Sequence, residues 1–351
     1  MPTPLRTRRR FLGITAAASA LALAPGALRL AHATATATAQ PAHGIEPLHW
    51  RGVALGADAE LRLYHPNPAA AQRLLQQALA EIQRLESIFS LYRDDSALAT
   101  LNRQGHLNEP PADLLRLLAE SIHYGQLTGG AFDPSVQPLW QLYAEHFSRP
   151  EADPAGPTPA ALQAALARVD YRAIQAEPGR IVLQRPGMAL TLNGIAQGYI
   201  TDRITELLRA GGLDRALVDL GEIRGLDSHP AANTPPWRVG LARPQAPDQV
   251  YTTVEIRSQA LATSGGYGTP LAPAGCHTHL FDPRTGVAQP RYRSVSVLAA
   301  TATMADALST AFSNMALGDT AGVVKQLGLH AWFVLADGSV TEQGEPASAQ
   351  T

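Results

Sequence analysis

The chain has 351 residues, with 28 Lys or Arg against 30 Asp or Glu, so its formal net charge is −2 at pH 7. A slight net charge with no basic stripe argues against nucleic acid as a partner. The sequence contains a single cysteine, so no disulfide can form within the chain and a packed core must stabilise it. The length allows one large domain or two subdomains.

The N-terminus is predicted to be an export signal. Residues 1–33 have a basic start, an apolar stretch and the small-residue cleavage site AHA (31–33), which are the three regions of a signal peptide. TRRRFL (7–12) matches the twin-arginine pattern, and we favour that route over a general secretory signal that is rich in arginine. The expected location is therefore the periplasm. An Ala/Thr-rich spacer (34–48) precedes the expected folded domain (49–345).

The first part of the domain predicts strands followed by a long helix. Residues 51–64 alternate between apolar and polar side chains and indicate one or two strands. Residues 66–89 predict an amphipathic helix. Its apolar side consists of Leu74, Leu75, Ala78, Ile82, Leu85 and Ile88. Tyr92 follows in a polar turn, where Asp95 or Ser96 can cap the next helix, or where the tyrosine ring can stack on a flat ligand.

A second predicted helix (111–128) is stopped by two glycines before the stretch AFDP (131–134). Glycines at this point let the backbone approach a ligand closely, and the alternative is an ordinary helix end followed by a proline turn. A further helix (159–168) and a strand (181–184) are expected next.

Three glycine-containing turns follow predicted strands. LTLNGIAQGY (190–199) runs from a strand into a helix (200–208), and such a turn leaves backbone N–H groups free to bind a phosphate. Strands at 216–220 and around 254–261 also end in glycine turns. These turns suit a nucleotide-sized ligand, but any mixed α and β protein needs them for tight connections. The expected fold class is α+β, with sheets covered by amphipathic helices.

The C-terminal stretch 276–317 combines a polar loop, a strand (294–298) and a helix with Leu308, Phe312 and Met315 on its apolar side. Thr301 or Thr303 is the expected N-cap.

Asp306 and Thr310 are four residues apart, so they lie on the same face of this helix. A carboxylate and a hydroxyl presented in this way suit Mg²⁺ beside a phosphate. The alternative is that Asp306 only stabilises the helix dipole. His277 and His279 lack the Cys/His cluster of a zinc site, and the sequence has no Walker loop, GxSxG or HExxH motif.

Seven stretches together resemble the ApbE family of FAD:protein FMN transferases, in the same order along the chain. They are FSLYRDDSALATLN (89–102), GGAFDPSVQPLWQLY (129–143), LNGIAQGYITD (192–202), LVDLGEIRG (217–225), ATSGGY (262–267), HLFDPRTG (279–286) and SVSVLAATATMADALSTAF (294–312). The resemblance implies an ApbE-like fold in which FAD lies between two halves.

The resemblance also implies an activity and a set of site residues. A Thr or Ser hydroxyl of a partner protein would attack the flavin-side phosphorus of FAD, in a Mg²⁺-dependent reaction that releases AMP. Asp306, Thr310 and the backbone carbonyl of Gly194 match the metal ligands. His279 and Asp306 match catalytic positions, and His279 would hold the phosphates or pass a proton, or would only support the site. The implied FAD-binding residues are Leu55, Tyr92, Ala131, Phe132, Asp133, Thr191, Gln197, Ser264, Gly265 and His279.

Several positions depart from the family pattern. Many relatives have Asp at the position of Thr191, Lys or Glu at that of Gln197, and a smaller residue at that of Asn193; LGA (55–57) replaces a common MGT. These changes alter how adenosine and phosphate would be bound. Together with the twin-arginine signal, this version resembles the NosX-type branch, which implies a membrane flavoprotein such as NosR as the acceptor, with its flavin domain facing the periplasm.

Two other functions remain open from the sequence. With water as the nucleophile, the same site would be an FAD pyrophosphatase that gives FMN and AMP. A periplasmic flavin carrier without turnover is the second alternative, supported by Thr191 and Gln197. The Asp306/Thr310 pair argues against a carrier, because a carrier has little need of a metal.

Overall fold

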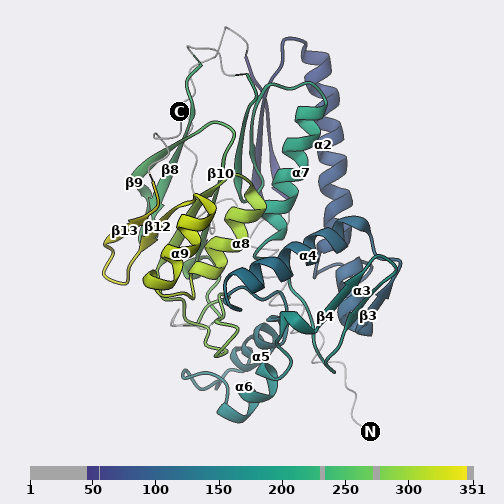
Figure 1. Cartoon of the computed structure of the whole chain (residues 1–351), viewed down its shortest axis with the longest axis vertical. Coiled ribbons are helices and arrows are strands. Elements are labelled where there is room, and N and C mark those ends of the chain that lie inside the picture. The colour runs from purple at the N-terminus through teal and green to yellow at the C-terminus, as the bar shows by residue number, and fades with distance from the viewer. Residues whose placement is uncertain (1–45, 55, 230–233, 272–276, 346–351) are drawn as a thin grey trace.

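The computed structural model describes residues 46–54, 56–229, 234–271 and 277–345. The predicted signal peptide, the spacer up to residue 45, Leu55 and Cys276 lie outside these residues. The described residues form a mixed α+β fold built on antiparallel sheets, as predicted (Figure 1). No helix in these ranges is long and apolar enough to span a bilayer.

An eight-stranded sheet forms the centre of the fold, in the order β1-β2-β6-β7-β10-β11-β12-β13, and all neighbouring strands are antiparallel. The strands are β1 (Leu48–Ala54), β2 (Ala57–Tyr64), β6 (Arg215–Asp219), β7 (Ile223–Asp227), β10 (Ala260–Gly265), β11 (Ser294–Ala299), β12 (His330–Val334) and β13 (Val340–Gln343).

Both faces of this sheet are buried in its central part. Because successive side chains of a strand point to opposite faces, Val218 and Leu217 of β6 enter two different apolar clusters. The cluster on one face contains side chains of α2 (Pro68–Phe89), α7 (Ala196–Ala210) and α8 (Ala302–Phe312). The other face is covered by the hairpin of β8 (Trp237–Arg243) and β9 (Ala246–Ile256), with Trp237 fully buried.

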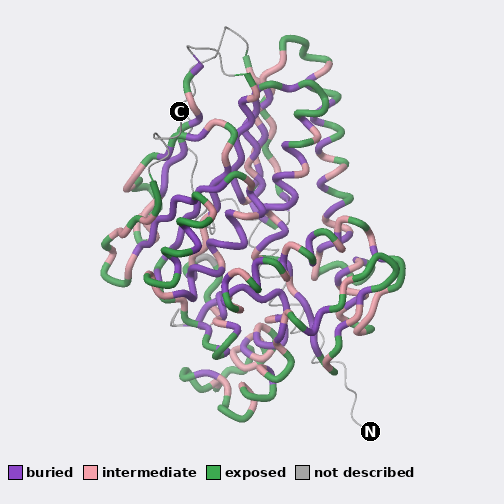
Figure 2. The backbone as a smooth tube through the Cα atoms, viewed as in Figure 1, coloured by how far each residue is buried: buried purple, intermediate pink, exposed green. Residues whose placement is uncertain are grey.

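Helix α2 is the predicted amphipathic helix. All six residues of its predicted apolar side are buried, whereas its outer side is exposed (Figure 2). The helix begins after Asn67, whose Oδ1 accepts hydrogen bonds from the N–H groups of Ala69 and Ala70. The polar cap and the apolar stripe therefore fix both the start and the orientation of this helix.

A smaller layer packs beside the large sheet. It contains a three-stranded sheet in the order β3-β5-β4, made of β3 (His106–Asn108), β5 (Arg180–Leu183) and β4 (Ile174–Glu177). The remaining helices are α3 (Ala97–Gln104), α4 (Ala112–Leu127), α5 (Gln137–Phe147), α6 (Pro159–Leu166) and α9 (Leu317–Leu327), with short 3₁₀ turns η3 (Tyr171–Ala173) and η4 (Gly266–Gly268). Helices α5 and α6 share a separate apolar cluster with Phe281 and Ala288.

Four local predictions were wrong. The strand expected at the start of LTLNGIAQGY (190–199) is absent, because residues 188–192 have no regular secondary structure. The other three predictions were wrong in their bounds. The strand expected around 254–261 is divided at 257–259, because β9 belongs to the covering hairpin and β10 to the large sheet. The helix carrying Asp306 ends at Phe312, so Met315 is buried in the segment that follows it. Helix α7 starts at Ala196, four residues earlier than expected. Of the alternative caps, Ser96 caps α3 and Thr301 caps α8.

Candidate active site

Helices α7 and α8 are in close contact where Gly198 faces the start of α8. A Cβ atom on Gly198 would lie 2.3 Å from the carbonyl oxygen of Ala302, so only glycine allows this approach. The N–H of Gly198 donates a hydrogen bond of 3.0 Å to Oδ2 of Asp306. The close approach therefore places the Asp306 carboxylate directly against the first turn of α7.

The carboxylate of Asp306 is buried, with 3% of the residue exposed. Burial raises the pKa of Asp306 to about 7, the N–H of Gly198 lowers it, and the negative charge of Asp202 raises it again. None of the ion pairs among the described residues includes Asp306. A buried acid without a cationic partner is costly unless it is protonated or a bound cation compensates it.

Thr310, Gly194 and Ser264 meet one helical turn further along α8. A Cβ atom on Gly194 would lie 3.0 Å from Oγ1 of Thr310, so the turn before α7 passes directly beside this hydroxyl. Oγ of Ser264, on β10, lies 3.2 Å from Oγ1 of Thr310 and 2.8 Å from Oγ of Ser309. The structure thus brings a carboxylate, two hydroxyls and a glycine turn together from three separate parts of the chain.

Glu222 lies near Asp306, and Asp219 lies near Glu222; the sequence reasoning did not single out either acid. Burial, together with the charges of Asp306 and Asp219, raises the pKa of Glu222 well above its ordinary value. Burial also raises the pKa of Asp219 to about 7. Asp219 is the last residue of β6, and Glu222 lies in the turn that follows it (DLGE, 219–222). The signal that could have found them is a pair of acids beside a strand-end glycine. Gln197 lies over this turn, since a Cβ atom on Gly221 would be 2.4 Å from its Nε2.

The loop that follows α4 is connected to the turn before α7. The N–H of Thr191 donates a hydrogen bond of 2.8 Å to the carbonyl of Pro134. The side chains of Ala131 and Phe132 are buried in the core, where the Phe132 ring packs against Tyr124. Their N–H groups both donate to Thr128. Contact of Ala131 and Phe132 with a ligand would therefore have to be made by their carbonyl oxygens.

Asp133 uses both carboxylate oxygens within the protein. Oδ1 accepts hydrogen bonds from the N–H and the hydroxyl of Ser135, at 2.8 and 2.6 Å, and Oδ2 accepts from the N–H of Tyr171 at 2.9 Å. Burial raises the pKa of this carboxyl, and the hydrogen bonds from Ser135 and Tyr171 oppose the shift. These bonds fix the shape of the loop between α4 and α5.

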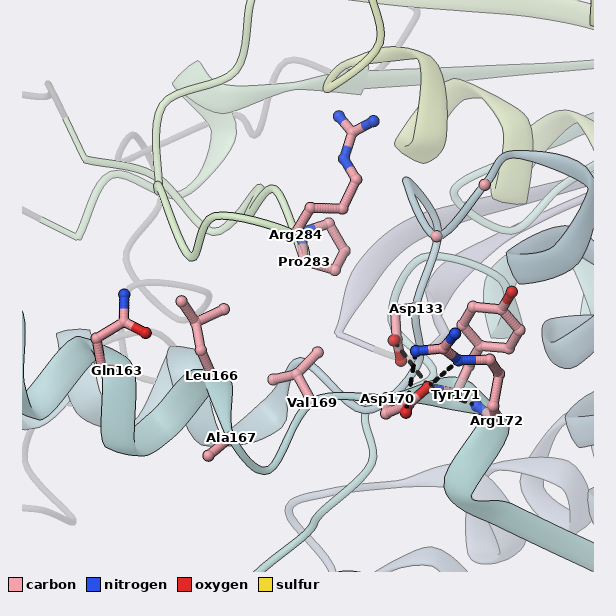
Figure 3. Close-up of a pocket in the computed structure, with 12 residues that line it drawn as sticks. Asp133, Gln163, Leu166, Ala167, Val169, Asp170, Tyr171, Arg172, Pro283 and Arg284 are labelled. Carbon is pink, nitrogen blue, oxygen red and sulfur yellow. Dashed lines mark hydrogen bonds and ion pairs between the residues drawn. The ribbon is translucent and has the colours of Figure 1, made fainter.

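A cavity of about 480 Å³ opens beside Asp133. Figure 3 shows Asp133, Asp170, Tyr171 and Arg172 on one side of it, with Pro283 and Arg284 on the facing loop. The two arginines are paired with Asp170 and Asp282, at 2.7 and 2.9 Å. The charges that line the cavity are therefore largely neutralised by their neighbours.

The loop that carries His279 is anchored at both ends. A Cβ atom on Gly266 would lie 2.8 Å from Cγ2 of Thr278, so the loop lies against the turn that follows β10. The amide of Asn314, just after α8, donates to the carbonyl of Phe281, and Arg284 donates to the carbonyl of Asn314. The loop is thus attached to the segments that directly follow β10 and α8, the two elements that carry Ser264 and Thr310.

His279 is held in its neutral form. Burial lowers the pKa of His279 below its ordinary value of 6.5. Its Nδ1 is buried and has no hydrogen-bond partner in the part of the chain that the structure describes. His277 differs, because its ring packs against Tyr143 and Phe147 and its Nε2 lies 3.2 Å from the carbonyl of Pro154. Nδ1 of His277 is also without a partner among the described residues, but its ring belongs to this aromatic cluster, whereas His279 lies beside the turn that follows Ser264.

The sequence model of the ApbE family matches residues 55–333 of this chain. The chain belongs to the ApbE family. It is 32% identical to the FAD:protein FMN transferase of Treponema pallidum, over 81% of this chain and 83% of the relative. The FAD:protein FMN transferase of Salmonella typhimurium is 28% identical, with 82% of each chain covered.

Solved ApbE structures have the same fold. The ApbE protein of Thermotoga maritima superposes with a TM-score of 0.75 at 27% identity, over 85% of this chain and 97% of that one. The flavin transferase ApbE of Vibrio cholerae gives a TM-score of 0.72 at 26% identity, over 85% and 96%. These matches confirm the predicted family and fold class.

In this ApbE chain, the structure brings together four of the residues proposed from the sequence. Gly194, Ser264, Asp306 and Thr310 meet at the contact of α7, α8 and β10. Tyr92 lies on a surface turn with 72% of the residue exposed. Leu55 lies outside the described residues. The proposed roles of all these residues stay predictions, and Asp133 and Phe132 have structural contacts that the sequence did not reveal.

Proposed function

We propose that this protein transfers the FMN moiety of FAD to a Thr or Ser hydroxyl of an acceptor protein, with Mg²⁺ required and AMP released. The relatives are named for this transfer, and the conserved order of family stretches supports it. The observation that carries the proposal is the buried Asp306 carboxylate, which has no cationic partner in the described part of the chain and lies one helical turn from the contact of Gly194 with Thr310.

The side chains at this contact fit a hard divalent cation. The described residues contain no group of three or more His, Cys, Asp or Glu that could hold a metal. The proposed site needs no such group, because its ligands are one carboxylate (Asp306), one hydroxyl (Thr310) and one backbone carbonyl (Gly194), completed by phosphate oxygens of FAD. A Mg²⁺ ion bound there would neutralise charge on the pyrophosphate and on the departing AMP. Glycine at 194 leaves this space open, whereas a Cβ atom would lie 3.0 Å from Thr310 Oγ1 and crowd the hydroxyl.

The reaction is a substitution at the flavin-side phosphorus. The acceptor hydroxyl oxygen forms a bond to this phosphorus, and the bond from the phosphorus to the bridging oxygen breaks, so that AMP leaves with that oxygen. The hydroxyl proton must pass to a base. We assign this role to His279, because its lowered pKa keeps the imidazole neutral and its Nδ1 has no partner among the described residues.

The acceptor and the location are part of the proposal. The TRRRFL stretch supports export by the twin-arginine route, and the resemblance to the NosX-type branch supports a NosR-like membrane flavoprotein whose flavin domain faces the periplasm. Replacing Arg8 and Arg9 by Lys in the full chain should retain the protein in the cytoplasm, as cell fractionation would show. Export of this variant at the normal level would contradict the twin-arginine assignment.

One experiment tests the transfer. The mature protein is incubated with FAD and Mg²⁺, with and without a NosR-like flavin domain, and the products are analysed by mass spectrometry. We expect the acceptor domain to gain one FMN, and AMP to accumulate only when the acceptor is present. Asp306→Asn should abolish both changes. Release of FMN and AMP at the same rate without acceptor would establish a pyrophosphatase instead, and bound but intact FAD under both conditions would establish a carrier.

A further inference from the structure

The segment 194–202 and helix α8 pass each other in opposite directions and meet at three levels, each one helical turn apart. Gly194 faces Thr310, Gly198 donates to Asp306, and the carboxylate of Asp202 accepts from the N–H of Ala302. From one level to the next, the residue number rises by four on the 194–202 segment and falls by four on α8. The first two levels contain the residues proposed to bind the metal, and the third contains no such residue.

The third level is the most extensively hydrogen-bonded of the three. Oδ1 of Asp202 accepts from the N–H of Ala302 at 2.8 Å, and Oδ2 accepts from the N–H and the hydroxyl of Thr303 at 2.8 and 2.6 Å. Ala302 and Thr303 are the first two residues of α8, so their N–H groups have no acceptor within the helix. A carboxylate from α7 thus caps α8, in addition to the ordinary cap by Thr301.

Arg224 connects this cap to the large sheet. The guanidinium of Arg224, on β7, forms an ion pair with Oδ1 of Asp202, and both residues are buried with 6% exposed. The hydroxyl of Thr201, the residue before Asp202, also donates to the carbonyl of Glu222 in the turn before β7. The start of α8 is therefore fixed through α7 to a central strand of the sheet.

We propose that Asp202 is a positioning residue, which sets the register of α8 against the 194–202 segment and so brings Gly194, Asp306 and Thr310 to the spacing that a divalent cation requires. This inference rests on the proposed function, because that function assigns the three groups to the metal. Metal–oxygen distances tolerate deviations of only about 0.2 Å. A helix advances about 1.5 Å per residue, so even a small slide of α8 would separate the ligands.

Asp202→Asn would weaken two charge interactions at once, one with the N–H groups at the start of α8 and one with Arg224. Asn at position 202 would have one acceptor oxygen in place of two, and its amide would face an N–H donor of α8 or the Arg224 guanidinium. The buried Arg224 would then lack its anionic partner. The first turn of α8 would be free to shift, although Asp202 itself lies one full turn away from Asp306 along the contact.

Asp227 provides a matched control. It is also a buried aspartate with 6% exposed, and its Oδ2 is paired with Arg215 and Arg257 at 3.2 and 2.9 Å. Its hydrogen bonds and ion pairs within the described residues are to Arg215 of β6 and to Arg257 and Ser258, and none of them reaches α8. Asp227→Asn therefore disturbs a buried ion pair of the same kind without disturbing the cap of α8.

The experiment measures Mn²⁺ binding to the mature protein with FAD present, from the loss of the free Mn²⁺ signal in electron paramagnetic resonance, together with thermal unfolding. We expect Asp202→Asn to weaken Mn²⁺ binding by about tenfold or more. Asp227→Asn should lower the melting temperature comparably but leave Mn²⁺ binding unchanged. Thr303→Ala, which removes only one hydrogen bond to Asp202, should weaken binding by about threefold and serves as the measurement if Asp202→Asn does not fold.

Two outcomes would overturn the inference in distinguishable ways. If the wild type binds Mn²⁺ but Asp202→Asn and Thr303→Ala bind it with unchanged affinity, Asp202 has a purely structural role and the proposed function stands. If the wild type binds no Mn²⁺ in the presence of FAD, the metal assignment within the proposed function fails, and the positioning role fails with it.

Discussion

The main-chain N–H of Gly198 donates a 3.0 Å hydrogen bond to the carboxylate of Asp306, across a gap that has no room for a side chain at 198. This contact joins two stretches that are 108 residues apart in the sequence. It explains why residue 198 is a glycine, and it gives a buried acid, which forms no ion pair within the described residues, a defined orientation in the interior.

Gly198→Ala should separate α7 from α8. The added Cβ atom would meet only backbone atoms, at 2.3 Å from Ala302 O and 2.8 Å from Thr303 N, and these cannot move without moving the helix. We expect a loss of stability of about 1–3 kcal/mol and a large loss of FMN transfer. Chemical denaturation and the transfer assay measure these two effects.

Gly322→Ala is the control for this substitution. Gly322 is an exposed residue in α9, and a Cβ atom there would meet nothing within 4 Å. Alanine should stabilise α9 by up to about 1 kcal/mol and leave transfer unchanged. A Gly198→Ala protein with wild-type transfer and stability would show that the two helices do not need this contact.

The raised pKa of Asp306 predicts that metal binding depends on pH. Since burial raises this pKa to about 7, the metal-free protein holds a proton on Asp306 below pH 7, and a cation must displace it. The apparent affinity for Mg²⁺ should therefore fall by up to about tenfold per pH unit below 7 and level off above it. Calorimetry in two buffers of different ionisation enthalpy should detect about one proton released per ion at about pH 6 and far less at about pH 8. An affinity that is constant across this range would contradict the prediction.

Features of this site that arise between neighbouring residues were predicted from the sequence, whereas features that depend on contacts between distant parts of the chain were not. The α2 stripe and the shared face of Asp306 and Thr310 are local consequences of helical periodicity, and they were predicted from neighbouring residues. The caps at Ser96 and Thr301 were each predicted as one of two neighbouring candidates. The division of 254–261 between two sheets was not predicted, because Val254, Ile256 and Leu261 all enter the same apolar cluster and only the tertiary packing separates the two strands.

The contacts of Asp202 and Asp133 also could not be predicted from local pattern. Asp202 accepts hydrogen bonds from Ala302 and Thr303, which are 100 and 101 residues further along the chain. Asp133 accepts one from Tyr171, which is 38 residues further along. An aspartate in an early turn of a helix ordinarily indicates a dipole interaction with its own helix, so the sequence gives no sign that Asp202 caps a different one. Asp133 was predicted to bind FAD because it belongs to a family stretch. Its hydrogen bonds to Ser135 and Tyr171 were not predicted.

His279 should control the acid side of the pH–rate profile when Mg²⁺ is saturating. Burial lowers its pKa below 6.5, so the imidazole is neutral and able to accept a proton at pH 6.5 and above, and the rate should fall only at lower pH. A higher Mg²⁺ concentration should not move this fall in rate along the pH axis. A fall caused by protonation of Asp306 would instead move to lower pH, because Mg²⁺ competes with the proton for that carboxylate. His279→Gln should reduce transfer by about 10²–10⁴-fold and remove this fall in rate. A variant that retains full activity would show that His279 only supports the loop.

Asp133→Asn tests whether Asp133 holds its loop or binds the ligand. The asparagine keeps one acceptor for Ser135, but its amide would face the N–H of Tyr171, which donates to Oδ2 at 2.9 Å in the native protein. Because a buried donor is then left without an acceptor, we expect a loss of stability of about 1–3 kcal/mol. The affinity for FAD, measured by quenching of flavin fluorescence under conditions in which the variant is folded, should change by less than about threefold.

Ser135→Ala, which removes only the hydroxyl that donates to Oδ1, should show a smaller loss of stability and the same affinity. If the Asp133→Asn protein has native stability but binds FAD at least tenfold more weakly, which corresponds to about 1.4 kcal/mol, this carboxylate contacts the flavin nucleotide directly.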